Sequence, residues 1–137
     1  MYHSILLAAD GSEYSYRAAE ELLHFIGEDT QVTILHVVDA DASKTDVLHG
    51  TQGRSLTDDR KKKLQEVTDM FDRNSVNYSI RLEHGTPNKT VVKVANSGEY
   101  QAVILGTRGL NNLQEMMLGS VSHKVAKRAN IPVVIAK

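Results

Sequence analysis

The chain has 137 residues, of which 41% are hydrophobic, and its 16 basic and 17 acidic residues give a formal net charge of -1. This composition predicts one packed domain over residues 1–137, and the charge balance argues against sequence-independent binding to nucleic acid. The absence of cysteine excludes a disulfide framework and thiol catalysis. The sequence shows neither a leader pattern nor a membrane-spanning run, so we expect a cytoplasmic protein without a membrane partner.

Apolar runs alternate along the chain with segments of helical periodicity. The runs are rich in β-branched residues and are short enough to be strands, whereas the segments between them repeat apolar residues every three or four positions. The pattern predicts strands over residues 4–9, 31–38, 76–83, 102–105 and 133–136, and helices over residues 13–26, 57–73, 87–97 and 120–129. Residues 39–56 have no clear period, and we expect a mobile surface loop there.

The alternation of strands and helices predicts the fold class. Parallel strands joined through helices form an open α/β sheet that is covered on both faces. We therefore expect a Rossmann-like, doubly wound sheet with five parallel strands.

A glycine-rich stretch follows the fourth predicted strand directly. Gly106 and Gly109 come first, and Gly119, Ser120 and Ser122 then open the last helix. Glycine allows a backbone to approach a ligand closely, and the N-terminus of a helix attracts anions. Serine hydroxyls can donate hydrogen bonds to phosphate oxygens. The stretch therefore predicts a phosphate site, although glycines that merely form a turn and a serine that merely caps a helix remain an alternative.

The motif differs from the common phosphate-binding motifs. It has no Lys-Ser/Thr ending, so it is not a Walker loop, and no G-x-G-x-x-G follows the first strand. The spacing G-x2-G-x9-G-S instead resembles the ATP-binding signature of the universal stress protein family. Asp10-Gly11-Ser12 after the first strand, His36-Val37-Val38-Asp39 at the end of the second and the closing Ile-Pro-Val-Val-Ile resemble other parts of that family.

The resemblance implies a strand order of 3-2-1-4-5 and a nucleotide site where the first and fourth strands end. Ala9, Asp10 and the backbone of Val38 would hold the adenosine part, with helix capping as the alternative role for Asp10. The loop would hold the phosphates. The binding residues that the resemblance and the motif imply are Ala9, Asp10, Val38, Gly106, Thr107, Arg108, Gly109, Gly119, Ser120, Val121 and Ser122.

Other chemistry is weakly supported by the sequence. The six histidines have no metal-ligand spacing, and no serine has a histidine placed to activate it. Arg108 either reaches a phosphate or is solvated. A magnesium or manganese ion would arrive with the phosphates and would need no site built from protein side chains.

These features predict a regulatory protein of the stress response that binds ATP or AMP, with little or no hydrolysis. The resemblance also implies a homodimer through residues 133–136, and an apolar edge strand there needs a cover. Two alternatives use the same fold: a slow ATPase or phosphotransferase, and a nucleotide-free, chaperone-like interaction protein.

Overall fold

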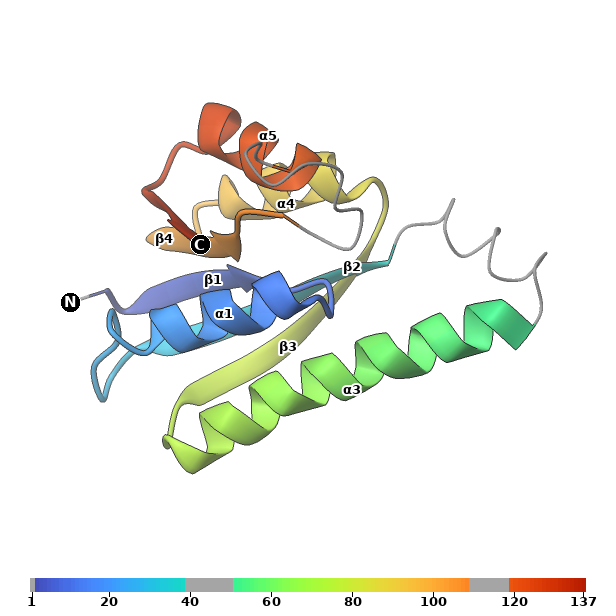
Figure 1. Ribbon diagram of the computed structural model, residues 1–137. Coiled ribbons are helices and arrows are strands. Elements are labelled where there is room, and N and C mark those ends of the chain that lie inside the picture. The colour runs from blue at the N-terminus through green and yellow to red at the C-terminus, as the bar shows by residue number, and fades with distance from the viewer. Residues whose placement is uncertain (1, 39–50, 109–118) are drawn as a thin grey trace.

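The computed structural model describes residues 2–38, 51–108 and 119–137, with side chains described outside residues 51–60. A five-stranded parallel sheet has the order β3-β2-β1-β4-β5, with β1 at its centre (Figure 1). The prediction of a doubly wound sheet with this strand order is confirmed. The strands are β1 (Ser4–Ala8), β2 (Gln31–Val38), β3 (Asn77–His84), β4 (Ala102–Gly106) and β5 (Val133–Ala136).

Two hydrophobic cores lie on opposite faces of the sheet. Along β1, Ile5 and Leu7 belong to one core and Leu6 to the other, as the alternation of side chains along a strand requires. Each of these side chains is 0% exposed. Continuous apolar sequence in the central strands therefore reflects burial on both faces.

Helices form a layer on each side of the sheet, as Figure 1 shows. Helices α1 (Glu13–Leu22) and α3 (Thr51–Arg73) contact each other and cover the face with the Leu7 core. Helices α4 (Pro87–Ala95) and α5 (Ser120–Arg128) pack together against the other face.

Two predicted helix boundaries were wrong. Helix α1 ends at Leu22 rather than at residue 26. The next hydrogen bonds span three residues instead of four, because the N–H of Leu23 donates to Glu20 O and that of Phe25 donates to Leu22 O. Helix α3 begins at Thr51, inside the segment predicted to be a loop. Once a helix is nucleated, each further residue adds easily, and one internal glycine costs only about 1 kcal/mol. Residues 39–50 of the predicted loop lie outside the described residues.

The edge strand β3 is only partly covered. Tyr78 packs against the core under α3, and its ring lies 5.7 Å from that of Phe71. Farther along the strand, Ile80 and Leu82 are each 59% exposed. The covered apolar face expected along this strand was therefore wrong beyond Tyr78, since Arg81 and Glu83 on the other face are half-buried instead.

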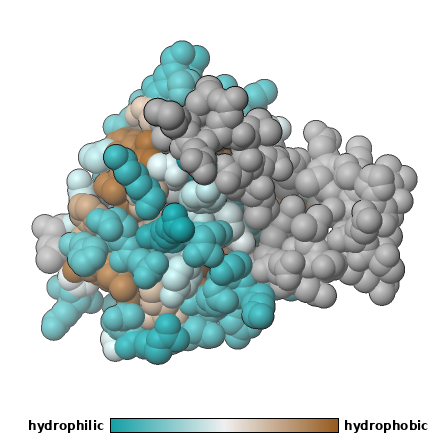
Figure 2. Space-filling model, viewed as in Figure 1, coloured by the Kyte–Doolittle hydropathy of each residue, from teal (hydrophilic) through white to brown (hydrophobic). Residues whose placement is uncertain are grey.

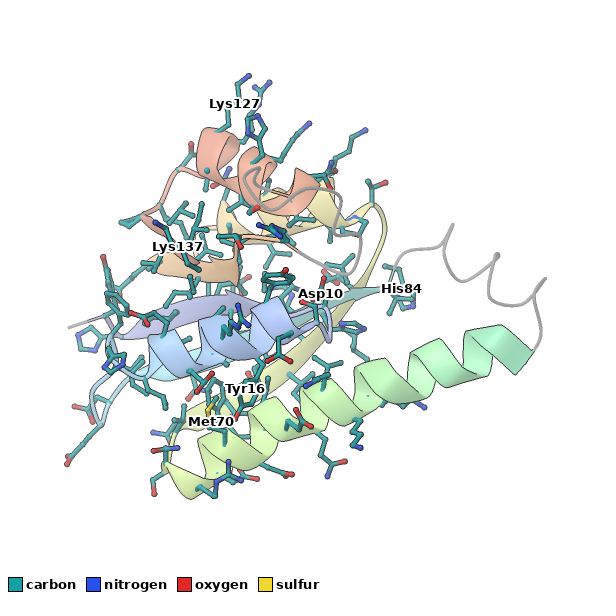
Figure 3. The ribbon with its side chains drawn as sticks, in the orientation of Figure 1. Asp10, Tyr16, Met70, His84, Lys127 and Lys137 are labelled. Carbon is teal, nitrogen blue, oxygen red and sulfur yellow. The ribbon has the colours of Figure 1, made fainter. Side chains whose placement is uncertain are left out.

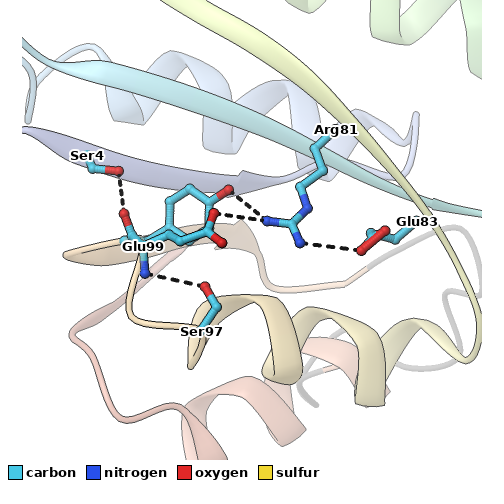
Figure 4. A network of polar contacts seen from close by, with 6 residues as sticks. Ser4, Arg81, Glu83, Ser97 and Glu99 are labelled. Carbon is cyan, nitrogen blue, oxygen red and sulfur yellow. Dashed lines mark hydrogen bonds and ion pairs between the residues drawn. The ribbon is translucent and has the colours of Figure 1, made fainter.

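A polar network connects β3 to the start of β4 (Figure 4). Arg81 Nη1 donates to the Tyr100 hydroxyl at 3.2 Å and to Glu99 Oε2 at 3.3 Å, and its Nη2 lies 3.4 Å from Glu83 Oε1. The bond to Tyr100 raises the pKa of Arg81. Glu99 O accepts from Ser4 Oγ at the first residue of β1. This network therefore joins the N-terminal ends of β1 and β4, far from where those strands end.

In the coloured part of the face that Figure 2 shows, most residues are hydrophilic, and hydrophobic residues appear at several separate places between them. In the part of the chain that the structure describes, no helix is both long and apolar enough to span a bilayer.

The attachment of α3 to the sheet depends on Phe71, which is fully buried. We predict that Phe71→Ala lowers the free energy of unfolding by about 3–5 kcal/mol, because it leaves a cavity between α3 and the sheet. Gln65→Ala, on the exposed side of the same helix, should change it by less than about 0.5 kcal/mol. Urea denaturation followed by circular dichroism measures both. Equal effects of the two variants would show that α3 does not depend on this contact.

Candidate functional site

Strands β1 and β4 end side by side at the centre of the sheet. Leu7 pairs with Ile104, so Asp10 and Thr107 each lie three residues past the same paired position. Neighbouring strands are about 5 Å apart. Strands β2 and β3 lie on one side of this junction and β5 on the other, so the order of connection reverses there. Ligands of open α/β sheets bind at such a switch point.

Asp10 forms a local turn at the end of β1. It is half-buried, and its Oδ1 accepts a hydrogen bond from the N–H of Ser12 at 3.0 Å. Ser12 is the N-cap of α1, because its Oγ accepts from the N–H of Ser15 at 3.2 Å. Capping of α1 is thus a function of Ser12, and the alternative of Asp10 as the helix cap is not what the structure shows.

The backbone of Ala9 is fixed from β2. Its N–H donates to Leu35 O at 2.9 Å, and its carbonyl lies 3.0 Å from His36 Nδ1. Because a carbonyl only accepts, Nδ1 is the protonated nitrogen in this contact. At the end of β2, the carbonyl of Val38 accepts from the N–H of Gly85. The backbones of Ala9, directly after β1, and of Val38, the last residue of β2, are therefore both held by hydrogen bonds.

The carbonyl of Thr107 joins the two halves of the glycine-rich motif. It accepts from the N–H of Gly119 at 2.7 Å and from the hydroxyl of Ser122 at 2.6 Å. The N–H of Thr107 donates to Ala136 O on β5. The end of β4 and the start of α5 are therefore in direct contact, although the segment between them, which includes Gly109, lies outside the described residues.

The N-cap residue of α5 provides no side-chain cap. Its N-cap residue is Gly119, which has no side chain to accept a hydrogen bond, and the structure shows no side-chain cap bond there. The first N–H groups of a helix have no partner within the helix. Those of Ser120, Val121 and Ser122 occupy the first turn of α5, with Ser120 exposed and Val121 half-buried. This arrangement suits an anion.

Ser122 has a different role from the one expected. Its side chain is buried, with 2% exposed, and its only hydroxyl proton is engaged by the Thr107 carbonyl. In this arrangement it stabilises the closure of the loop and does not offer a proton to a ligand.

Gly106 allows α1 to approach the end of β4. A Cβ at this position would lie 2.7 Å from both the Cβ and the backbone oxygen of Tyr14. We had expected this glycine to make room for a ligand, but the atoms that occupy the space belong to the first turn of α1. The close approach also places Tyr14 beside Arg108, whose Nη1 donates to the Tyr14 hydroxyl at 3.3 Å.

The site thus gathers most of the predicted residues at one edge of the sheet. Figure 3 shows Asp10 at this edge, where β1 passes into α1. Two residues that the sequence analysis did not assign to the site also contact it: His36 through Ala9, and Tyr14 through Gly106 and Arg108. Nothing in the spacing of the glycine motif indicates Tyr14, because the contact arises only when α1 packs on β4. Within the described residues, no group of three or more His, Asp or Glu could hold a metal ion.

A doubly wound parallel sheet whose order of connection reverses between β1 and β4 defines an open α/β protein. The model of the universal stress protein family matches residues 1–137, and the chain belongs to that family.

Known relatives match over the whole chain. Universal stress protein MJ0577 of Methanocaldococcus jannaschii is 29% identical over 157 residues, an alignment that covers 100% of this chain and 96% of the relative. Its solved structure superposes with a TM-score of 0.79, with 28% identity and coverage of 100% and 96% of the two chains.

Two more distant solved structures share the fold. A universal stress protein in complex with cAMP has a TM-score of 0.69 at 20% identity, over 99% of this chain and 97% of its own. A universal stress protein family protein from Arabidopsis thaliana with AMP bound has a TM-score of 0.64 at 19% identity, over 98% of this chain and 90% of its own.

The contact between Gly106 and Tyr14 generates a prediction. We expect Gly106→Ala to lower the free energy of unfolding by about 1–3 kcal/mol, because the new methyl group meets backbone atoms that cannot rotate away. Thermal unfolding followed by circular dichroism measures the change. A melting temperature equal to that of the wild type would show that α1 and β4 are not in such close contact.

Proposed function

We propose that the chain is a regulatory protein of the stress response, a single domain over residues 1–137, that binds an adenine nucleotide, ATP or AMP, where β1 and β4 end. The nucleoside lies against Ala9, Asp10 and Val38. The phosphates lie at the start of α5, between the glycine-rich loop and the first turn of that helix.

The observation that carries this proposal is the N-terminus of α5. Gly119 cannot cap the helix, and its own N–H is engaged by Thr107, so the N–H groups of the next three residues define the anion site. The positive end of the helix dipole adds to their attraction for phosphate. Asp10, at the neighbouring strand end, would repel phosphate but accept hydrogen bonds from the nucleoside. The two ends of a nucleotide therefore have separate, chemically matched places.

The relatives support the choice of ligand. Two proteins of the same fold are described as complexes, one with cAMP and one with AMP, and both ligands combine adenosine with phosphate. We extend to this chain only the chemistry that those ligands share. The loop residues Gly109, Thr107 and Arg108 complete the proposed phosphate site.

The proposed role is binding and not turnover. Neutral donors such as backbone N–H groups hold ground state and transition state about equally, and such uniform binding does not accelerate hydrolysis. A magnesium or manganese ion that accompanies the nucleotide would be held by phosphate oxygens and water.

Nucleotide binding can be tested at Ser120, the first residue of α5. We predict that Ser120→Ala, which removes a hydroxyl, weakens ATP binding by up to about tenfold. Ser120→Pro, which also removes an N–H, should weaken it by about another tenfold, since a hydrogen bond to a charged group contributes about 1.5–3 kcal/mol. Isothermal titration calorimetry with ATP measures both constants.

The proline variant is designed to leave the fold unchanged. Proline is favoured at the first position of a helix, and Gly119 already has the extended backbone, with φ −66° and ψ 167°, that proline requires of the residue before it. The melting temperature of the unliganded variants is the control. A wild type that binds no adenine nucleotide, or a proline variant that binds ATP as tightly as the wild type, would contradict the proposal.

We also propose a homodimer through β5. This strand lies at the edge of the sheet, and its three valine and isoleucine side chains, Val133, Val134 and Ile135, are only half-buried in the single chain. Strand edges with apolar side chains are protected in native proteins by pairing or by a cover. Pairing of two copies of β5 would provide both.

The dimer can be tested by sedimentation. We predict that Val134→Lys shifts the protein towards monomer, because a buried lysine charge without a partner is costly. Val92→Lys replaces another half-buried valine, on α4, and should leave the dimer intact. Analytical ultracentrifugation distinguishes the species, and circular dichroism checks that both variants fold. A wild type that sediments as a monomer at high concentration would refute this part of the proposal.

A further inference from the structure

Tyr14 contacts two guanidinium groups at the edge of the proposed site. The Cζ atom of Arg108 lies 5.5 Å from the centre of the Tyr14 ring, and that of Arg17, one turn farther along α1, lies 5.7 Å from it. The Tyr14 hydroxyl also accepts from Arg108 Nη1 at 3.3 Å. Arg108 therefore contacts both the ring and the hydroxyl of Tyr14.

The position of Tyr14 is fixed by the fold. Its backbone and Cβ lie against Gly106 so closely that no side chain fits at that position. Gly106 is the last residue of β4, and Arg108 follows it by two residues. Tyr14 thus connects the first turn of α1 to the loop that begins the proposed phosphate site.

The contacts restrict Arg108 in a way that favours anion binding. The bond from Arg108 Nη1 to the Tyr14 hydroxyl fixes the direction of one of the five guanidinium donors. Two guanidinium groups approach the same ring and bring two positive charges near the start of the loop. Of the acids at this edge, Glu13 is paired with Lys63 at 3.1 Å, and Asp10 accepts from the N–H of Ser12. Arg108 follows Thr107 in the sequence, and the carbonyl of Thr107 accepts from the N–H of Gly119 at the start of α5.

We propose that Tyr14 is a positioning residue that holds the Arg108 guanidinium beside the end of β4, where the glycine-rich loop begins, and that the pair determines preference for phosphorylated nucleotides over the free nucleoside. The inference rests on the proposed nucleotide site. An arginine on a glycine-rich loop would otherwise lose the entropy of several rotatable bonds when it meets a phosphate, and the ring removes part of that cost before the ligand arrives.

The test compares ATP with adenosine. Cation–π contacts are modest, so we expect Tyr14→Leu to weaken ATP binding by about fivefold and to change adenosine binding by less than about twofold. Arg108→Gln should weaken ATP binding at least as much. In the Arg108→Gln background, Tyr14→Leu should have no further effect, because residues that act through one interaction are not additive. Titration calorimetry at constant salt gives all the constants.

Two further variants separate positioning from stability. Tyr14→Phe keeps the ring and removes the hydroxyl, so its loss of ATP affinity should be smaller than that of Tyr14→Leu. Tyr16→Leu removes a half-buried ring of the same helix that packs on the hydrophobic core, and it should leave the ratio of ATP to adenosine affinity unchanged.

The outcomes for the site and for Tyr14 are distinct. A wild type that binds neither ligand contradicts the nucleotide site and, with it, the role of Tyr14. Two results would contradict the role of Tyr14 alone, in a wild type that prefers ATP to adenosine. In the first, Tyr14→Leu leaves that preference unchanged. In the second, Tyr14→Leu lowers the preference equally in the wild type and in the Arg108→Gln background.

Discussion

The carbonyl of Thr107 is the point on which the site depends. It accepts two short hydrogen bonds, from the N–H of Gly119 and from the hydroxyl of Ser122. Together they hold the start of α5 directly against the end of β4. The N-cap glycine then leaves the first turn of α5 without a side-chain cap. A helix terminus of this kind is stabilised by an anion, which connects the closure of the loop to the proposed binding of phosphate.

A second constraint acts on the opposite side of the same strand. Gly106 has no Cβ, and α1 uses the resulting space for the backbone of its first turn. The turn at Asp10 and the start of the glycine-rich loop are thereby brought together, although they are almost a hundred residues apart in the sequence. The glycine motif therefore has two physical roles: one glycine permits the packing of helix on strand, and another leaves a helix end uncapped.

The sequence was sufficient for the fold because burial on both faces has a clear pattern. The run Ile5-Leu6-Leu7 is typical of a strand buried on both faces, and the alternation of strands with helices then predicts a parallel sheet. The ends of α1 and α3 were misjudged, since they depend on local hydrogen bonds and on helix propagation, which composition does not reveal. The sequence predicted that Asp10 and the loop would meet, but not that Ser122 is buried against Thr107 or that Tyr14 contacts Arg108. Both contacts arise from packing between distant segments.

The central claim is that an adenine nucleotide binds where β1 and β4 end, with its phosphates at the start of α5. The most direct measurement is a titration of the ¹⁵N-labelled protein with ATP, followed by two-dimensional NMR of the backbone amides. The account predicts that the largest shifts occur at Asp10, Thr107 and residues 119–122, and that Ser4, Glu99 and Tyr100, at the start of β1 and β4, are unaffected. No shift at any amide, or shifts centred away from the junction of β1 and β4, would contradict it.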